Sequence, residues 1–186
     1  AFAHSTEVLP SLSFAAKQDR QPVDAAKLSR ARRYWEERLD TLGEAPQLPY
    51  AVQLHTIDQP RFERFEHSIE APRVAMLLEA SRRAECTISS VLLAAYALVL
   101  HTFSSEQSAC VINVLRFNRP QAASHLLGDF TSLSLLRVAF QKKEHPQEDD
   151  FSSLVRNVQQ QLWQDLDHGL VDGVDVMRWL ASRRSQ

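Results

Sequence analysis

The longest uncharged stretch of this 186-residue sequence runs from Cys86 to Ser105, and its fully apolar part is Val91–Leu100. A helix that crosses a bilayer needs about 20 apolar residues, so this part is too short to span one. Thr87 is a suitable N-cap, which predicts a helix at about 87–103. Because that helix is apolar on nearly all sides, we expect it to be the most buried helix of the fold.

The rest of the sequence carries the patterns of further helices and strands. Apolar residues recurring on one face predict helices at about 23–42, 151–168 and 173–183. Pro72, a suitable first helical residue, predicts a further helix at about 72–85. Alternation, or richness in Val, Ile and Leu, predicts strands at about 61–70, 110–117 and 133–140. This order predicts an α/β fold, a two-layer sandwich with helices packed on a small mixed sheet.

Charge and cysteine content exclude several classes of function. The net charge of −2 gives no basic surface for nucleic acid or for an anionic membrane. Cys86 and Cys110 form no CxxC pair, and no His or Cys cluster has the spacing of a metal site. Two reduced, mostly buried thiols and the lack of a signal peptide predict a cytoplasmic protein.

Several segments occur in the order of one known family. They are Ala31–Leu39 with its Tyr-Trp pair, Ala45–Pro49, Thr87–Tyr96, Ile112–Arg119, Gly128–Leu136 and Leu162–His168. The Gly128–Leu136 segment reads GDFTSLSLL and matches the motif GDFTxLxLL. Together they resemble the heterocyclization (cyclization) domain of non-ribosomal peptide synthetases, within the condensation-domain superfamily.

The resemblance implies a fold, a reaction and partners. The fold is a chloramphenicol-acetyltransferase-like pair of lobes with a tunnel between them, which phosphopantetheine arms of carrier proteins enter. An acyl or peptidyl thioester condenses with a Cys, Ser or Thr aminoacyl thioester. Loss of water then gives a thiazoline or oxazoline, for a siderophore or another ring-bearing metabolite. Phosphopantetheine arrives with the substrates, and no other cofactor or metal is implied.

The resemblance also divides the chain into parts. It implies a loop or linker at 1–22, a linking helix and proline-rich crossover at 23–50, and a C-terminal-lobe part at 51–186. The family's paired-aspartate motif would precede the Tyr-Trp helix, and its FTS segment would follow Gln186. We therefore expect a partial lobe that is silent alone, whose catalytic residues are unknown. Its partners are then the N-terminal lobe, the C-terminal remainder and carrier proteins.

Asp129 and Thr131 are the first candidates for the tunnel wall. They lie two residues apart at a strand entrance and so share one face. Both could position the amide carbonyl of the substrate or relay a proton. In the structural alternative, Asp129 caps the turn made by Gly128, and Thr131 is a good strand residue.

Asn118 and Arg119 end a strand and face the same loop. Arg119 could contact a phosphopantetheine phosphate or the opposing lobe. A solvent-exposed turn is the structural alternative for this pair.

Asp167, His168 and Asp172 match two short motifs, DxxxxD and the HxxxDG of acyltransferases. A catalytic His needs a carboxylate to hold its tautomer, so the residue types suit acyl transfer. The match follows the GDFTSL segment, however, which is the wrong order for the family. Gly169 as a C-cap and Asp172 as an N-cap explain the same residues structurally. Two alternative functions thus stay open: a non-catalytic carrier-protein docking module and a stand-alone acyltransferase that uses His168.

Overall fold

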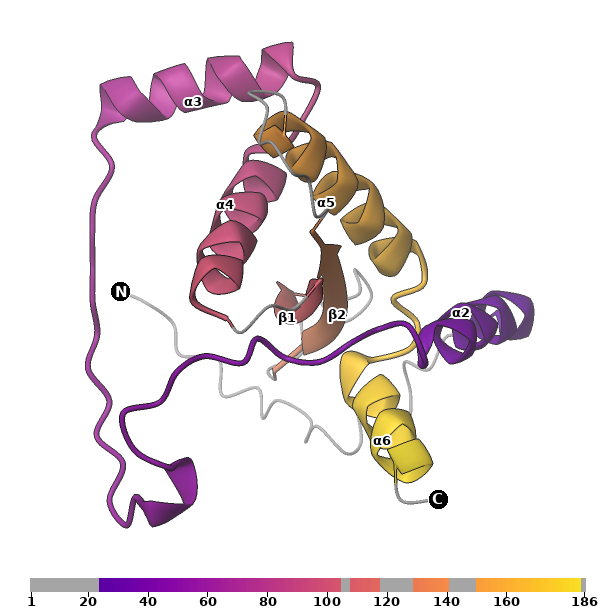
Figure 1. Cartoon of the computed structure of the whole chain (residues 1–186). Helices are drawn as coiled ribbons and strands as arrows, with labels where there is room; N and C mark the ends of the chain where they lie inside the picture. The colour runs from indigo at the N-terminus through magenta and orange to yellow at the C-terminus, as the bar shows by residue number, and fades with distance from the viewer. Residues whose placement is uncertain (1–23, 105–107, 118–128, 141–149, 185–186) are drawn as a thin grey trace, which may run out of the picture. The chain divides into compact units, whose positions relative to one another are not determined.

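The computed structural model describes residues 24–104, 108–117, 129–140 and 150–184. The α/β class is confirmed, and the helices and strands follow the predicted order except that the strand expected at 61–70 is not formed (Figure 1). They are α2 (Ala25–Arg38), the short 3-10 helix η1 (Leu54–Thr56), α3 (Ala71–Arg83), α4 (Ile88–Phe103), β1 (Ala109–Phe117), β2 (Thr131–Ala139), α5 (Asp150–Asp167) and α6 (Gly173–Arg184).

The chain divides into two compact units, each with its own core. Unit 1 comprises residues 1–40, 113–135 and 166–186, and unit 2 comprises residues 41–112 and 136–165. The core of unit 1 contains Ala31, Trp35, Leu39, Leu135, Val171 and Val176. The core of unit 2 contains Leu42, Ala94, Ala97, Cys110, Ile112, Leu136, Val138, Val155, Val158 and Leu162.

The strands β1 and β2 form a two-stranded sheet. The Phe140 N–H, just after β2, donates to the Ser108 carbonyl, just before β1, at 2.8 Å. The start of one strand therefore lies beside the end of the other, so the pair is antiparallel. Backbone N–H groups of a strand alternate between its two edges, and even-numbered ones of β2 thus point toward β1.

In unit 2, α5 holds the turn between α3 and α4. Gln159 accepts a hydrogen bond from the Thr87 N–H at 2.7 Å and donates its Nε2 to the Glu85 carbonyl at 3.0 Å. Glu85 has a φ of 55°, a left-handed conformation that costs a residue other than glycine energy. The Thr87 hydroxyl accepts from the Ser90 N–H at 3.1 Å and caps α4, as predicted.

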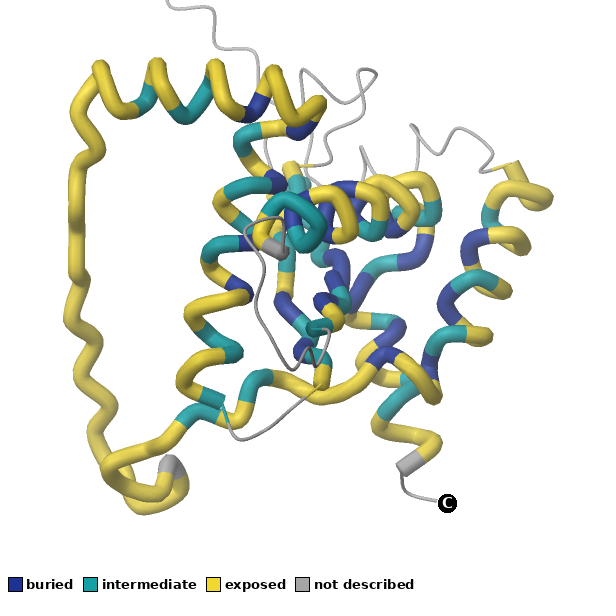
Figure 2. Tube along the Cα trace, turned by 45° about the horizontal axis from the view of Figure 1, so that its top comes forward, coloured by how far each residue is buried: buried dark blue, intermediate teal, exposed yellow. Residues whose placement is uncertain are grey.

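The strand predicted at 61–70 is wrong. These residues form an exposed, irregular segment before α3, exposed along its length in Figure 2. Phe62 and Phe65 are 93% and 91% exposed. Alternation showed where a strand could form, but a strand also needs a partner for its backbone groups. Within the described residues no strand pairs with this segment.

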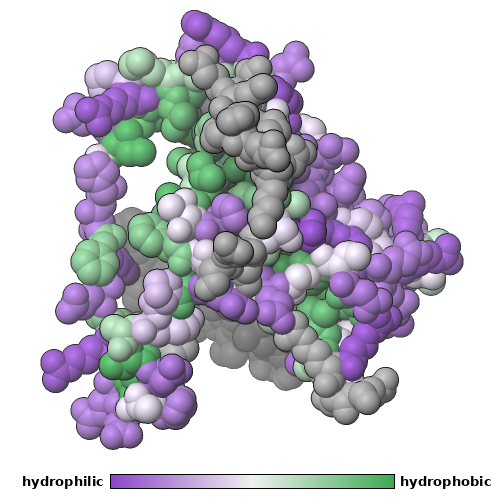
Figure 3. Space-filling view, in the orientation of Figure 1, coloured by the Kyte–Doolittle hydropathy of each residue, from purple (hydrophilic) through white to green (hydrophobic). Residues whose placement is uncertain are grey.

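The expectation that α4 is the most buried helix is also wrong. Only Ser90, Ala94 and Ala97 of α4 are buried. Side chains at three- and four-residue spacing instead form an exposed apolar stripe, the α4 stripe: Leu92, Tyr96, Val99 and Phe103, between 50% and 64% exposed. Figure 3 shows apolar side chains at the surface along α3 and α4. Apolar residues on all sides of a helix show that it can be buried. They do not show which of its faces the described part of the chain covers.

In the described part of the chain, no helix by itself has the length and apolar composition for a membrane span. Helices α3 and α4 meet that criterion only together, and they are bent by 100° relative to each other.

The α4 stripe makes a prediction for the 186-residue chain in solution. It should bind the dye ANS, because contiguous exposed apolar side chains create a site for it. A Tyr96→Gln/Phe103→Gln double variant should bind clearly less dye. Its stability should change by about 0.5 kcal/mol or less per site, as for surface substitutions. Fluorescence titration and urea unfolding measure the two.

Ile57→Gln serves as the control, since Ile57 is also exposed but lies outside the α4 stripe. Unchanged dye binding by the double variant would show that the stripe is covered in solution.

Candidate functional site

The entrance of β2 carries the first pair of candidates in unit 1. The Thr131 N–H donates to Asp129 Oδ1 at 2.8 Å and closes a turn. This contact is compatible with both interpretations of Asp129, as a turn residue and as a residue of the tunnel wall. The Thr131 hydroxyl and N–H both bind the carboxylate and lower the pKa of Asp129. Because its pKa is lowered, the Asp129 carboxylate is ionised at neutral pH. Because the side chain is exposed, the carboxylate is also accessible.

His168 lies at the start of the α5–α6 junction, which we define as residues 168–173. Its ring stacks on that of Tyr34 with centroids 3.9 Å apart and planes 6° apart. Its carbonyl accepts a hydrogen bond from Trp35 Nε1 at 3.2 Å. Arg38 donates to the Tyr34 hydroxyl and lies 4.9 Å from the centre of that ring. The Tyr-Trp pair of α2 thus fixes His168 by both its ring and its backbone.

The same junction binds β1. Arg116 Nη2 donates to the Gly169 carbonyl at 3.0 Å. A Cβ on Gly169 would lie 2.2 Å from Arg116 Nη1, so any larger residue would displace the guanidinium. The missing side chain at Gly169 leaves room for the guanidinium, but among the described glycines only Gly43 has the positive φ of a left-handed helix end, so Gly169 is not a left-handed C-cap of α5.

Asp172 uses both carboxylate oxygens on backbone amides. Oδ1 accepts from the Val174 N–H at 2.8 Å, which is the N-cap of α6 predicted from the sequence. Oδ2 accepts from the Leu133 N–H of β2 at 3.1 Å. With His168 held by α2 and Asp172 by β2 and α6, the arrangement favours the structural interpretation of this motif.

The remaining candidates have no role that the geometry defines. Asp167 is exposed at the end of α5. Asn118 and Arg119 lie outside the described residues, as does Gly128. Within the described residues no group of His, Cys, Asp and Glu could hold a metal. Burial raises the pKa of the Cys110 thiol, which keeps it protonated and a poor nucleophile at neutral pH.

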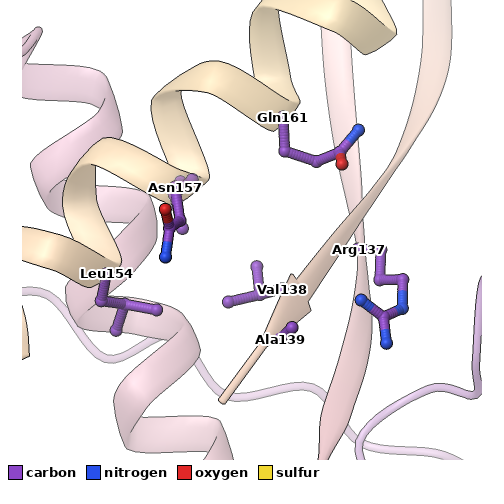
Figure 4. A pocket seen from close by; sticks show the side chains of 7 residues that line it. Arg137, Val138, Ala139, Leu154, Asn157 and Gln161 are labelled. Carbon is purple, nitrogen blue, oxygen red and sulfur yellow. The ribbon is translucent and has the colours of Figure 1, made fainter. Parts of the chain in front are cut away.

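A cavity of about 160 Å³ lies in unit 2 between β2 and α5 (Figure 4). It is lined by Arg137, Val138, Ala139, Leu154, Asn157, Val158 and Gln161. The Arg137 Nε is buried without a hydrogen-bond partner among the described residues. Three consecutive strand residues can line one cavity only along the strand edge, because their side chains alternate between faces. The space suits water or a small polar group that reaches this edge.

Comparison with known proteins gives the class to which this arrangement belongs. The model of the condensation domain matches residues 4–186. The pyochelin synthetase PchE of Pseudomonas aeruginosa is 34% identical over 175 residues, which are 91% of this chain and 12% of PchE. Bacitracin synthase 1 of Bacillus licheniformis is 32% identical over 163 residues, 85% of this chain and 3% of that synthase.

Solved structures agree with these relatives. The cyclization-docking bidomain of the non-ribosomal peptide synthetase EpoB from Sorangium cellulosum superposes with a TM-score of 0.73 at 26% identity, covering 86% of this chain and 32% of the bidomain. The first condensation domain of the calcium-dependent antibiotic synthetase has a TM-score of 0.64 at 18% identity, covers 96% of this chain and 38% of that one, and supports the fold alone.

The chain belongs to the condensation-domain family, and a cyclization domain of a non-ribosomal peptide synthetase is among the solved structures that it resembles. It spans only a small part of the curated relatives and about a third of the bidomain.

The residues that organise unit 1 were only partly visible in the sequence. The Tyr-Trp pair marked α2, but nothing in its spacing indicated that Tyr34 stacks on His168, 134 positions later. Arg116 is the one charged residue of the predicted strand, and its hydrogen bond to Gly169 had no sequence signal.

Trp35→Phe tests the anchoring of the junction. The variant keeps an aromatic ring in a buried site and removes the Nε1–H donor to His168, so the free energy of unfolding should fall by about 1–2 kcal/mol. Trp163→Phe is the matched control, since Trp163 is 52% exposed, and it should change stability by about 0.5 kcal/mol or less. Equal effects of both substitutions in urea unfolding would contradict the anchoring role.

Thr131→Val tests the cause of the lowered Asp129 pKa. The variant removes the hydroxyl donor and keeps the N–H donor, so the pKa should rise toward its ordinary value. Thr131→Ser keeps the hydroxyl and should leave the pKa low. A depressed carboxyl pKa adds stability above its unfolded pKa, and that stability is lost as the pH falls through the folded pKa. Carbon-13 NMR of the Asp129 carboxyl follows the titration directly.

Proposed function

We propose that this chain forms part of a cyclization domain that condenses an acyl or peptidyl thioester with a Cys, Ser or Thr aminoacyl thioester. The new amide is then cyclized with loss of water to a thiazoline or oxazoline. The observation that carries the proposal is the Asp129–Thr131 turn, which places an exposed and ionised carboxylate at the entrance of β2. The likeness of the chain to the EpoB cyclization domain supports the same reaction. The phenyloxazoline synthase MbtB of a Mycobacterium species, 28% identical over 179 residues, agrees with ring formation.

The two side chains have different roles in this proposal. A base with a lowered pKa is a weak proton acceptor, so Asp129 is poorly suited to proton relay at neutral pH. As an anion it is a strong hydrogen-bond acceptor, which suits it to orient an N–H, O–H or S–H of the condensed intermediate. The Thr131 hydroxyl donates to Asp129 and keeps lone pairs for a substrate N–H. Holding the nucleophile near the amide carbonyl is itself a large contribution to ring closure.

The proposed partners follow from the same assignment. They are the remaining parts of the domain and the acyl and aminoacyl carrier proteins, whose phosphopantetheine arms bring the substrates in the cytoplasm. Asn118 and Arg119 are retained as candidates for contact with the arm, on sequence grounds alone. The α4 stripe gives the remaining parts an apolar face to pack against.

The proposal predicts the products of Asp129→Ala and Thr131→Ala in the complete synthetase. With acyl- and cysteinyl-loaded carrier proteins, each variant should lower ring formation roughly tenfold to a hundredfold, as misplacement of reacting groups does. The condensed, uncyclized amide should accumulate, 18 mass units heavier than the ring because one water is retained. Intact-mass spectrometry of the carrier proteins separates the two species.

Asp175→Ala is the control, because Asp175 is paired with Arg178 on the outer surface of α6. If Asp129→Ala and Thr131→Ala both formed the ring at the wild-type rate, the assignment of the site to these two residues would be wrong. Carrier binding without turnover by the complete synthetase would favour the docking-module alternative. A stand-alone acyltransferase would show acyl transfer by the 186-residue chain that His168→Ala abolishes.

A further inference from the structure

Two carboxylates close the same edge of β2 at its entrance. Thr131 and Leu133 are two residues apart, so their N–H groups point to one edge of the strand. That edge is opposite β1, since the even-numbered Phe140 N–H points toward β1. The Thr131 N–H is taken by Asp129 and the Leu133 N–H by Asp172. The backbone that carries the proposed site is therefore held by side chains at this edge.

Asp172 and Gly173 contact Leu133 at both of its backbone polar groups. Asp172 Oδ2 accepts from the N–H at 3.1 Å. A Cβ on Gly173 would lie 3.0 Å from the Leu133 carbonyl oxygen and 3.1 Å from its carbon, tighter than ordinary van der Waals contact. The start of α6 thus lies close against the strand, and a side chain at residue 173 would require Leu133 to shift by a few tenths of an ångström.

Capping α6 does not account for the second oxygen of Asp172. Asp24 caps α2 with one oxygen, Oδ1, which accepts from both the Ala26 and Lys27 N–H groups. Asp172 caps α6 with Oδ1 alone and directs Oδ2 to a strand 39 positions away in the sequence. One carboxylate therefore sets the distance between the start of α6 and the strand that carries Thr131.

We propose that Asp172 is a positioning residue for ring formation: its carboxylate, with Gly173 beside it, fixes the backbone of β2 so that Asp129 and Thr131 face the substrate in the right place. The inference rests on the proposed function, because it assigns Asp172 a role through that site. Asp172 contacts neither substrate nor reacting atoms, and its influence passes through Leu133 to Thr131 along the strand.

Asp172→Asn separates the two bonds. In asparagine an NH2 donor replaces one of the two carboxylate oxygens, so it would face either the Val174 N–H or the Leu133 N–H, and that one hydrogen bond would be lost while the residue remains a good N-cap. Gly173→Ala perturbs the same contact sterically and leaves the carboxylate intact. Asp175→Asn is the matched control, since it removes the same charge three residues later in α6 without touching β2.

The test is a double-mutant cycle in the complete synthetase, with Asp172→Asn and Thr131→Ala alone and combined. Single-turnover rates of condensation and of ring closure are measured by mass spectrometry with loaded carrier proteins, and thermal unfolding is recorded for every variant. Asp172→Asn should slow ring closure roughly tenfold while condensation stays near wild type. The double variant should close the ring no more slowly than Thr131→Ala, because Asp172 acts only through the position of Thr131.

Each other outcome overturns the inference in a distinct way. Losses that multiply in the double variant, or that fall equally on condensation and ring closure, would mean that Asp172 is only structural. Full ring closure by Thr131→Ala would remove the proposed site itself, and with it the role of Asp172. If Asp172→Asn does not fold, Gly173→Ala takes its place in the same cycle, with the same expected results.

Discussion

Unit 1 depends on the short turn at residues 168–173, where backbone groups of the α5–α6 junction are bound by side chains from elsewhere in the sequence. Trp35 and Arg116 donate to the carbonyls of His168 and Gly169, and Asp172 accepts from Leu133. Carbonyls at a helix end have no partner within the helix and must find one. Here they accept from donors of α2 and β1. The residues that end α5 are therefore the same ones that connect it to α2, β1 and β2.

This constraint explains why a motif that resembles catalysis need not perform it. In the HxxxDG match, histidine offers a flat ring for Tyr34, glycine admits a guanidinium, and aspartate caps a helix and holds a strand. Each residue type is required by packing or hydrogen bonding, and together they reproduce the letters of an acyltransferase motif. Residue types at a given spacing define a chemistry only when the geometry brings them together.

Elements fixed by local chemistry could be predicted from the sequence, and those fixed by a distant neighbour could not. Thr87 and Asp172 cap their helices as expected, and the helical stripes lie close to their predicted bounds. The predictions at 61–70 and for the burial of α4 failed because each depends on a covering partner, which periodicity does not identify. Asp129 and Thr131 were found as a pair from their spacing, but the role of Asp172 required knowing that Leu133 lies beside it.

The electrostatics of the β2 entrance give a physical reason for two carboxylates there. An edge N–H that no strand satisfies must find another acceptor, and an anionic oxygen is a stronger one than water. Asp129 gains two donors from Thr131, which lowers its pKa and fixes it as an anion at the surface. Asp172 accepts from two donors that belong to different elements, the Leu133 N–H of β2 and the Val174 N–H of α6. Its two hydrogen bonds therefore set the distance between the start of α6 and β2. The strand entrance thus holds one carboxylate that is exposed and oriented, and a second whose oxygens are both occupied by the backbone. Only the first has the accessibility that a group in contact with substrate needs.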